Sequence, residues 1–70
     1  MILLKFSKQT TVDFADSKLS EDGMDEKTFH ENEVVAVDYL ENAYRGYVNA
    51  VFEDGKVAIG IDKRNFSIVG

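Results

Sequence analysis

The chain has 70 residues and a net charge of −5, which allows one small domain spanning residues 1–70. It contains no cysteine and a single histidine, so neither disulfides nor a structural metal is expected to stabilise the fold. No apolar run reaches the roughly 20 residues of a membrane-spanning helix, and the opening MILLKF is too short for a signal-peptide core, so we expect a cytoplasmic protein.

The N-terminal residues predict β-structure. Ile2, Leu4 and Phe6 alternate with more polar positions, which is typical of a strand with one buried face. Residues 10–14 (TTVDF) also have strand-like chemistry, and either continue the first strand or pair with it.

Acidic residues are concentrated between residues 13 and 33, where eight acids face only two lysines. Strand alternation stops there, and Gly23 argues against a long helix, so we expect a long acidic loop with at most a short helical turn beginning near Ser20. Such a charged stretch suits contact with a basic partner. The candidate partner-binding residues are Asp13, Asp16, Glu21, Asp22, Asp25, Glu26, Glu31 and Glu33.

Strand patterns return in the second half of the chain. Residues 34–40 (VVAVDYL) predict one strand, and residues 41–43 (ENA) a turn. Residues 47–62 then predict a hairpin around Asp54-Gly55, a dipeptide that favours a two-residue type I′ turn.

That turn would pair Val51 with Ala58 and Val48 with Ile61, and would place an apolar face toward the core. Gly60 falls inside the second strand, as Gly46 does near the start of the first, and glycine at such positions is typical of a bulge or bend. A turn at residues 62–65 and a short last strand complete the pattern.

Five or six short strands of this kind predict a small all-β barrel or sandwich. Residues 33–69 resemble the SH3-like barrel, and within it the Tudor-type arrangement, through VVAV, the pair Tyr44-Arg45 before GYVNAVF, a strand ending at Asp62, and FSIV. The resemblance implies recognition of a methylated or otherwise cationic peptide in an aromatic cage. The candidate cage residues are Tyr39, Tyr44, Asp62, Asn65 and Phe66.

Catalysis is not expected. His30 is the only histidine, and GKVAIG has Ile61 and Asp62 where a phosphate-binding loop needs Lys and Ser or Thr. The acids around Asp22 lack the spacing of a calcium loop, so no metal and no cofactor is expected.

The hypothesis we favour from the sequence is a protein-binding module, a small acidic regulator or inhibitor that docks on a basic surface of a partner protein. Nucleic-acid-binding proteins have such surfaces, so the partner class includes them, and the acidic stretch would then mimic nucleic acid as small viral inhibitors do. Direct nucleic-acid binding is disfavoured by the net charge of −5. Two alternatives stay open: a Tudor-like reader, or a structural subunit that pairs through exposed strand edges. Self-association is compatible with each of them.

Overall fold

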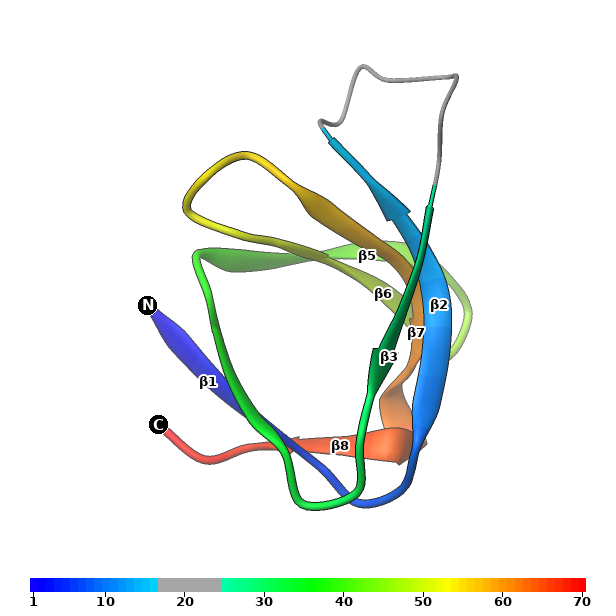
Figure 1. Ribbon diagram of the computed structural model, residues 1–70, viewed down its shortest axis with the longest axis vertical. Coiled ribbons are helices and arrows are strands. Elements are labelled where there is room, and N and C mark those ends of the chain that lie inside the picture. Colours follow the sequence, from blue (N-terminus) through cyan, green and yellow to red (C-terminus); the bar gives the residue numbers. More distant parts are fainter. Residues whose placement is uncertain (17–24) are drawn as a thin grey trace.

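The computed structural model describes residues 1–16 and 25–70, and in these residues the chain is all-β (Figure 1). One 3₁₀ turn, η1 (Lys63–Asn65), precedes the last strand. No helix in the described ranges is long and apolar enough to cross a membrane. The strands are β1 (Ile2–Phe6), β2 (Thr10–Ala15), β3 (Asp25–Phe29), β4 (Val34–Val37), β5 (Tyr39–Tyr44), β6 (Tyr47–Val51), β7 (Val57–Asp62) and β8 (Phe66–Ile68).

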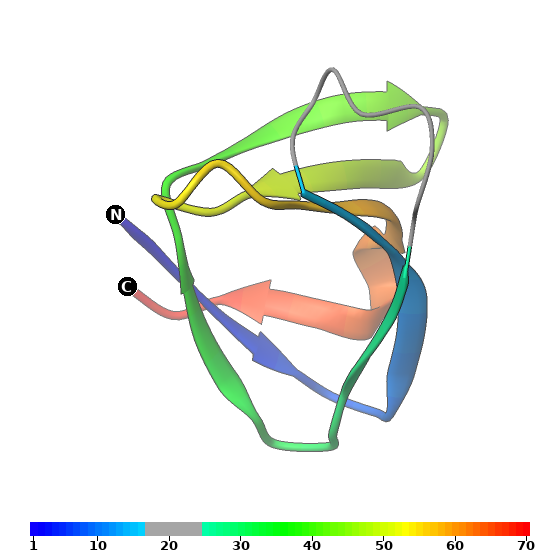
Figure 2. The same cartoon turned by 45° about the horizontal axis from the view of Figure 1, so that its top comes forward.

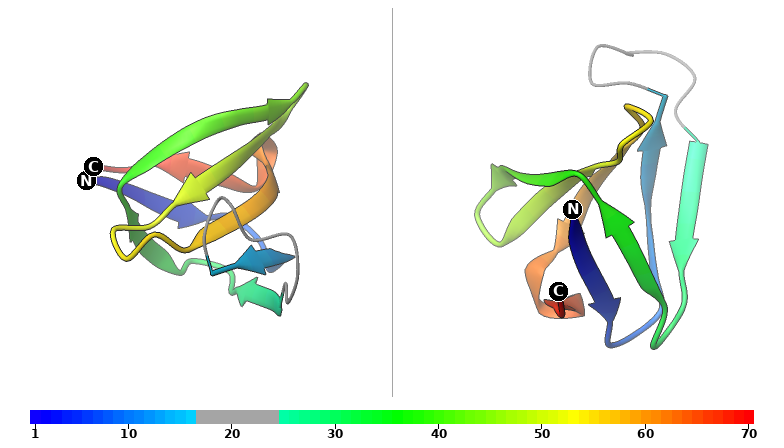
Figure 3. Two further views of the ribbon diagram at one scale, coloured as in Figure 1. Left: turned by 90° about the horizontal axis from the view of Figure 1, so that it is seen from above. Right: turned by 90° about the vertical axis from the view of Figure 1, so that its left-hand side faces the viewer.

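The strands form two antiparallel sheets around one core. The smaller sheet has the order β4-β1-β8, and the larger has the order β3-β2-β7-β6-β5 (Figure 2). The backbone after β8 bonds to β1, with the Leu3 N–H donating to the Gly70 carbonyl at 2.9 Å, so the two termini lie side by side (Figure 3). The all-β prediction is therefore confirmed, whereas the sheets do not close into a barrel.

The core lies between the two sheets. Leu4 and Phe6 of β1 are fully buried, as the alternation of the N-terminal segment predicts, together with Phe29 and Ile61. The rings of Phe6 and Phe29 stack with centroids 4.5 Å apart and planes 2° from parallel. Burying each such side chain contributes about 1.5–3 kcal/mol to folding, so this cluster holds the two sheets together.

The strand β2 neither continues β1 nor pairs with it, and both forms of that prediction are wrong. A bend at Ser7 and Lys8 turns the chain out of the smaller sheet and into the larger one, where β2 lies between β3 and β7. The bend separates two buried runs, because Phe6 ends the first and Thr10 begins the second. The strand-like segments before and after this bend therefore belong to different sheets.

Part of the predicted acidic loop is a strand. β3 pairs with β2 from Phe14 opposite Asp25 to Thr10 opposite Phe29. Only Phe29 of β3 is buried, so the strand needs no apolar alternation. Its extended conformation depends on pairing with β2. The helical turn expected near Ser20 lies outside the described residues.

The segment 34–40 is divided between two strands. The chain bends at Asp38, whose N–H donates to the Val51 carbonyl at 2.8 Å, and this bend carries it from the smaller to the larger sheet. The turn predicted at residues 41–43 is wrong, since β5 continues to Tyr44. The reversal occurs at Arg45-Gly46, where Gly46 adopts a φ of 81°.

The β6–β7 hairpin exists, but its turn is longer than predicted. The Phe52 N–H donates to the Lys56 carbonyl at 2.8 Å, and the Gly55 N–H to the Phe52 carbonyl at 2.9 Å. This three-residue loop shifts the register by one, so that Val51 faces Val57 instead of Ala58.

A bulge in β7 then restores the predicted register beyond it. The register shifts between Val48 and Ala50, and Val48 faces Ile61 as predicted. Gly60 has a φ of 75° at this point, so the expectation of a glycine bulge is confirmed. Because of the shift before the bulge, Ile59 shares a face with Asp13 of β2 instead of facing the core.

Candidate functional site

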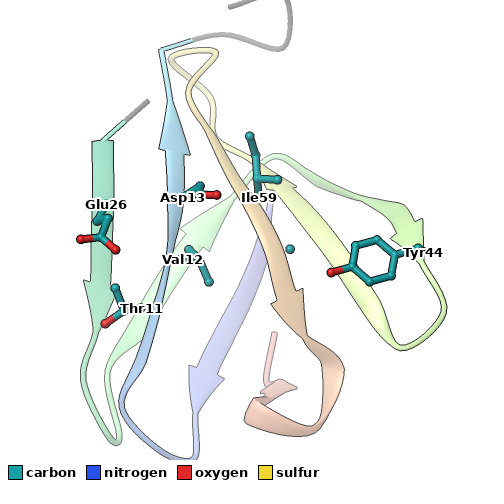
Figure 4. Close-up of a pocket in the computed structure, with 7 residues that line it drawn as sticks. Thr11, Val12, Asp13, Glu26, Tyr44 and Ile59 are labelled. Atoms are coloured by element: carbon teal, nitrogen blue, oxygen red, sulfur yellow. The ribbon is translucent and has the colours of Figure 1, made fainter. Parts of the chain in front are cut away.

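The outer face of the larger sheet contains a shallow depression of about 280 Å³ (Figure 4). It is formed where β3, β2 and β7 lie side by side and where the end of β5 reaches toward them. Its lining residues are Thr11, Val12, Asp13, Glu26, Tyr44, Ile59 and Gly60. Acidic, aromatic and aliphatic groups therefore meet in one place on an exposed sheet surface.

Two carboxylates lie next to each other in this depression. Asp13 of β2 is the direct cross-strand partner of Glu26 of β3, so both side chains are on the same face. Both are exposed, and none of the described residues that line the depression is a Lys or Arg. The nearest cation in sequence, Lys27, belongs to the other face of β3, where its ammonium lies 5.9 Å from the Phe14 ring centroid and 5.8 Å from that of Phe29.

The sheet around the carboxylates is held by side-chain contacts on the same face. Thr11 and Thr28 share a hydrogen bond of 2.9 Å between their hydroxyl oxygens, next to the Asp13–Glu26 pair in the ladder. On the other side, the Gly60 N–H donates to Asn49 Oδ1 at 3.0 Å, which ties the β7 bulge to β6. These contacts tie β2 to β3 and β7 to β6 around the depression.

Gly60 leaves the depression open. A Cβ built at this residue would have no atom within 4 Å, so the space above the bulge is empty. Figure 4 shows the Tyr44 ring pointing from the end of β5 toward this space. The tyrosine is 66% exposed and packs on Tyr47 with ring centroids 4.6 Å apart. An exposed aromatic side chain thus lies at the β5 end of the depression, with β6 and β7 between β5 and the strands that carry the carboxylates.

Asp62 is engaged by Arg64 and does not add free negative charge to this face. Arg64 Nη2 donates to Asp62 Oδ2 at 2.8 Å, and the Arg64 backbone N–H donates to Oδ1 at 2.9 Å. The side-chain hydrogen bond from Arg64, followed by the backbone bond, lowers the pKa of Asp62 to about 2. The same pair raises the pKa of Arg64.

Of the eight predicted partner-binding acids, the structure brings Asp13 and Glu26 together in the depression. Asp25 is exposed but lies opposite Phe14, on the other face of β3. The remaining described acids, Asp16, Glu31 and Glu33, lie in bends and turns, and Glu21 and Asp22 fall outside the described residues.

One of these acids has a structural contact of its own. Glu33 Oε1 accepts a hydrogen bond of 2.9 Å from the His30 backbone N–H, which stabilises the turn between β3 and β4. His30 itself is exposed at the start of this turn.

The five candidate cage residues are not gathered at one point. Tyr39 and Tyr44 lie at opposite ends of β5. Phe66 packs against the core ring of Phe6, with centroids 6.0 Å apart. Asn65 donates from Nδ2 to Thr10 Oγ1 at 3.3 Å. Tyr44 is the candidate that lines the depression.

Sequence reasoning missed four lining residues, Thr11, Val12, Ile59 and Gly60. Gly60 was recognised as a bulge signal, but its consequence for Ile59 depends on the hairpin register. Among the described residues, no group of three or more His, Asp and Glu could hold a metal ion.

Comparison with models of known protein families, with curated proteins and with solved structures found no match.

Proposed function

We propose that this chain is a non-catalytic protein-binding module that docks its outer sheet face on a basic surface of a partner protein. The observation that carries the proposal is the direct cross-strand placement of Asp13 and Glu26 in a depression whose described lining residues include no Lys or Arg. Like charges placed opposite each other destabilise a sheet, so this pair raises the free energy of the free protein. A lysine or arginine side chain from a partner would relieve that repulsion.

The neighbouring groups suit the same ligand. The Tyr44 ring, packed on Tyr47, offers an aromatic face to a cation, which contributes about 0.5–1 kcal/mol at an exposed site. Ile59 and the open space above Gly60 would contact the aliphatic stem of a lysine or arginine. Each exposed ion pair adds about 0.2–1 kcal/mol, so affinity would come from several such contacts along a basic surface.

The test uses a synthetic peptide with alternating Lys and Gly as the probe, with binding followed by amide chemical shifts. The variant Asp13→Asn/Glu26→Gln should weaken binding about tenfold and remove most of its salt dependence. A matched control, Asp25→Asn/Glu31→Gln, changes the net charge equally but leaves the depression intact. Equal weakening by both variants would mean that only net charge matters, and the proposed site would be wrong.

A second candidate function is recognition of a methylated cation, as in a Tudor-like reader. The exposed Tyr44, which lines the same depression as the two carboxylates, favours it. Replacing the peptide's lysines by trimethyl-lysine should then tighten binding, and Tyr44→Ala should abolish the preference while leaving the fold intact. A partner that binds unmodified lysine more tightly would favour simple acidic docking, which extends to basic surfaces of nucleic-acid-binding proteins.

We also propose the SH3-like, Tudor-type arrangement for residues 33–69, opened along one side. Its support is the succession of elements at the end of the chain. β7 ends at Asp62, the short turn η1 follows, and β8 is the last strand.

A further inference from the structure

A second depression lies along the side on which the two sheets do not join. Its volume is about 320 Å³, and it separates β5 and β6 of the larger sheet from β8 of the smaller one. In Figure 2, β8 lies below β6, with β5 beyond β6. The lining residues are Leu40, Val48, Lys63, Phe66 and Ile68, so the groove is apolar with one charged residue.

The backbone of β8 is unpaired along this groove. In the described part of the chain, β8 pairs with β1 alone. The Ser7 N–H donates to the Asn65 carbonyl at 2.8 Å, and hydrogen-bonded positions alternate in an antiparallel ladder. The register therefore directs the backbone polar groups of Phe66 and Ile68 away from β1, toward the groove. Such an edge is a template for a further strand.

The side chains of β8 also suit the addition of a further strand. Phe66 and Ile68 share a face with the core residues Phe6 and Leu4, their cross-strand partners in β1. Ile68 is nevertheless 61% exposed, at the edge of its sheet. An added strand would place every second side chain in the groove, against Leu40 and Val48.

The charge near the groove is positive although the whole chain is acidic. The Lys63 N–H donates to the Gly46 carbonyl at 3.0 Å, which holds η1 against the turn that contains Arg45. Arg64 and Asp62 neutralise each other in their ion pair. Lys63 and Arg45 are exposed, and none of the described residues that line the groove with Lys63 is acidic. This end of the groove therefore complements a carboxylate.

We propose that an extended segment of a partner protein adds to β8 as a further strand, with apolar side chains at alternate positions and an acidic residue beside Lys63. Main-chain hydrogen bonds would provide affinity, and the groove and Lys63 would provide specificity. This surface is separate from the outer face of the larger sheet, so the inference does not depend on the function proposed above.

An antiparallel strand added to β8 has its C-terminal end beside Lys63, so the test uses acetyl-Val-Thr-Val-Thr-Val-Glu-amide and its counterpart with Lys in place of Glu. Amide shifts of Phe66, Ser67 and Ile68 should move on addition of the Glu peptide. The Glu peptide should bind the wild-type protein about fivefold more tightly than the Lys peptide, and Lys63→Glu should reverse this order. Because Lys63 is exposed, the variant is expected to fold.

Two controls isolate the strand addition. N-methylation of the alternate peptide amides that face β8 should abolish the shifts, whereas methylation of the intervening set should weaken them far less. The variant Asp13→Asn/Glu26→Gln should bind the Glu peptide with unchanged affinity.

Three results would overturn the proposal. They are equal binding of both peptides to wild-type and Lys63→Glu protein, insensitivity to N-methylation, and concentration-dependent shifts at β8 without peptide. The last would assign the edge to a second copy of this chain.

Discussion

Removing the charge of Glu26 should stabilise the protein, although Glu26 lies in the candidate binding site. Directly opposed residues in an antiparallel pair have Cβ atoms about 5 Å apart, and two unit charges at that distance repel by about 0.8 kcal/mol in water. Screening at about 0.15 M salt, where the Debye length is about 8 Å, reduces this repulsion to about 0.4 kcal/mol. Glu26→Gln should gain that amount, and Glu26→Lys about twice as much because repulsion becomes attraction.

Urea unfolding measures this gain directly. With a slope of about 1 kcal/mol per M for so small a domain, the midpoint should rise by about 0.4 M for Glu26→Gln and by about 0.8 M for Glu26→Lys. Asp25→Asn is the matched control, since it removes one charge from the same strand but on the opposite face, opposite Phe14. Its midpoint should not rise.

The source of the gain is tested by a double-mutant cycle. In an Asp13→Asn background, Glu26→Gln should no longer stabilise, and at about 1 M salt, where the Debye length is about 3 Å, the wild-type gain should nearly vanish. If Glu26→Gln stabilises equally in both backgrounds, the two carboxylates do not interact, and the physical basis of the proposed cation site fails.

Three further changes test the fold around the site. Gly60→Ala should cost about 1–2 kcal/mol, because an L-residue resists the φ of 75° although no atom obstructs the Cβ, and calorimetry should show a lower melting temperature. Phe29→Ala should cost about 3–5 kcal/mol by removing the ring stacked on Phe6, which would leave the circular dichroism of an unfolded chain. The Asp62–Arg64 interaction stabilises the native state above about pH 4, and this contribution is lost as pH falls toward 2, because the native pKa of Asp62 is about 2 against 3.8 unfolded. Asp62→Asn should therefore be less stable than wild type at neutral pH, and the difference should shrink between pH 4 and pH 2 in urea titrations; a constant difference would contradict the assigned role of Arg64.

Local patterns in the sequence were sufficient to predict that most segments are strands. Alternation identified the buried face of β1, and the residues around Asp54-Gly55 identified the β6–β7 hairpin. The register far from the turn, with Val48 opposite Ile61, agrees with the sequence-based pairing, but only because the shift at the turn is reversed by the bulge. The concentration of acids between residues 13 and 33 is likewise a property of composition alone.

The tertiary structure alone decided which residues meet at the candidate site. β3 has almost no apolar alternation, so its pairing with β2 depends on non-local hydrogen bonds, and this pairing is what places Glu26 beside Asp13. The two shifts in the hairpin, at Gly55 and Gly60, cancel each other and turn Ile59 outward between them. The groove beside β8 exists because the chain changes sheets at Asp38 without β5 reaching β8. Each of these features arises from pairing between segments distant in sequence, which hydrophobic periodicity does not encode.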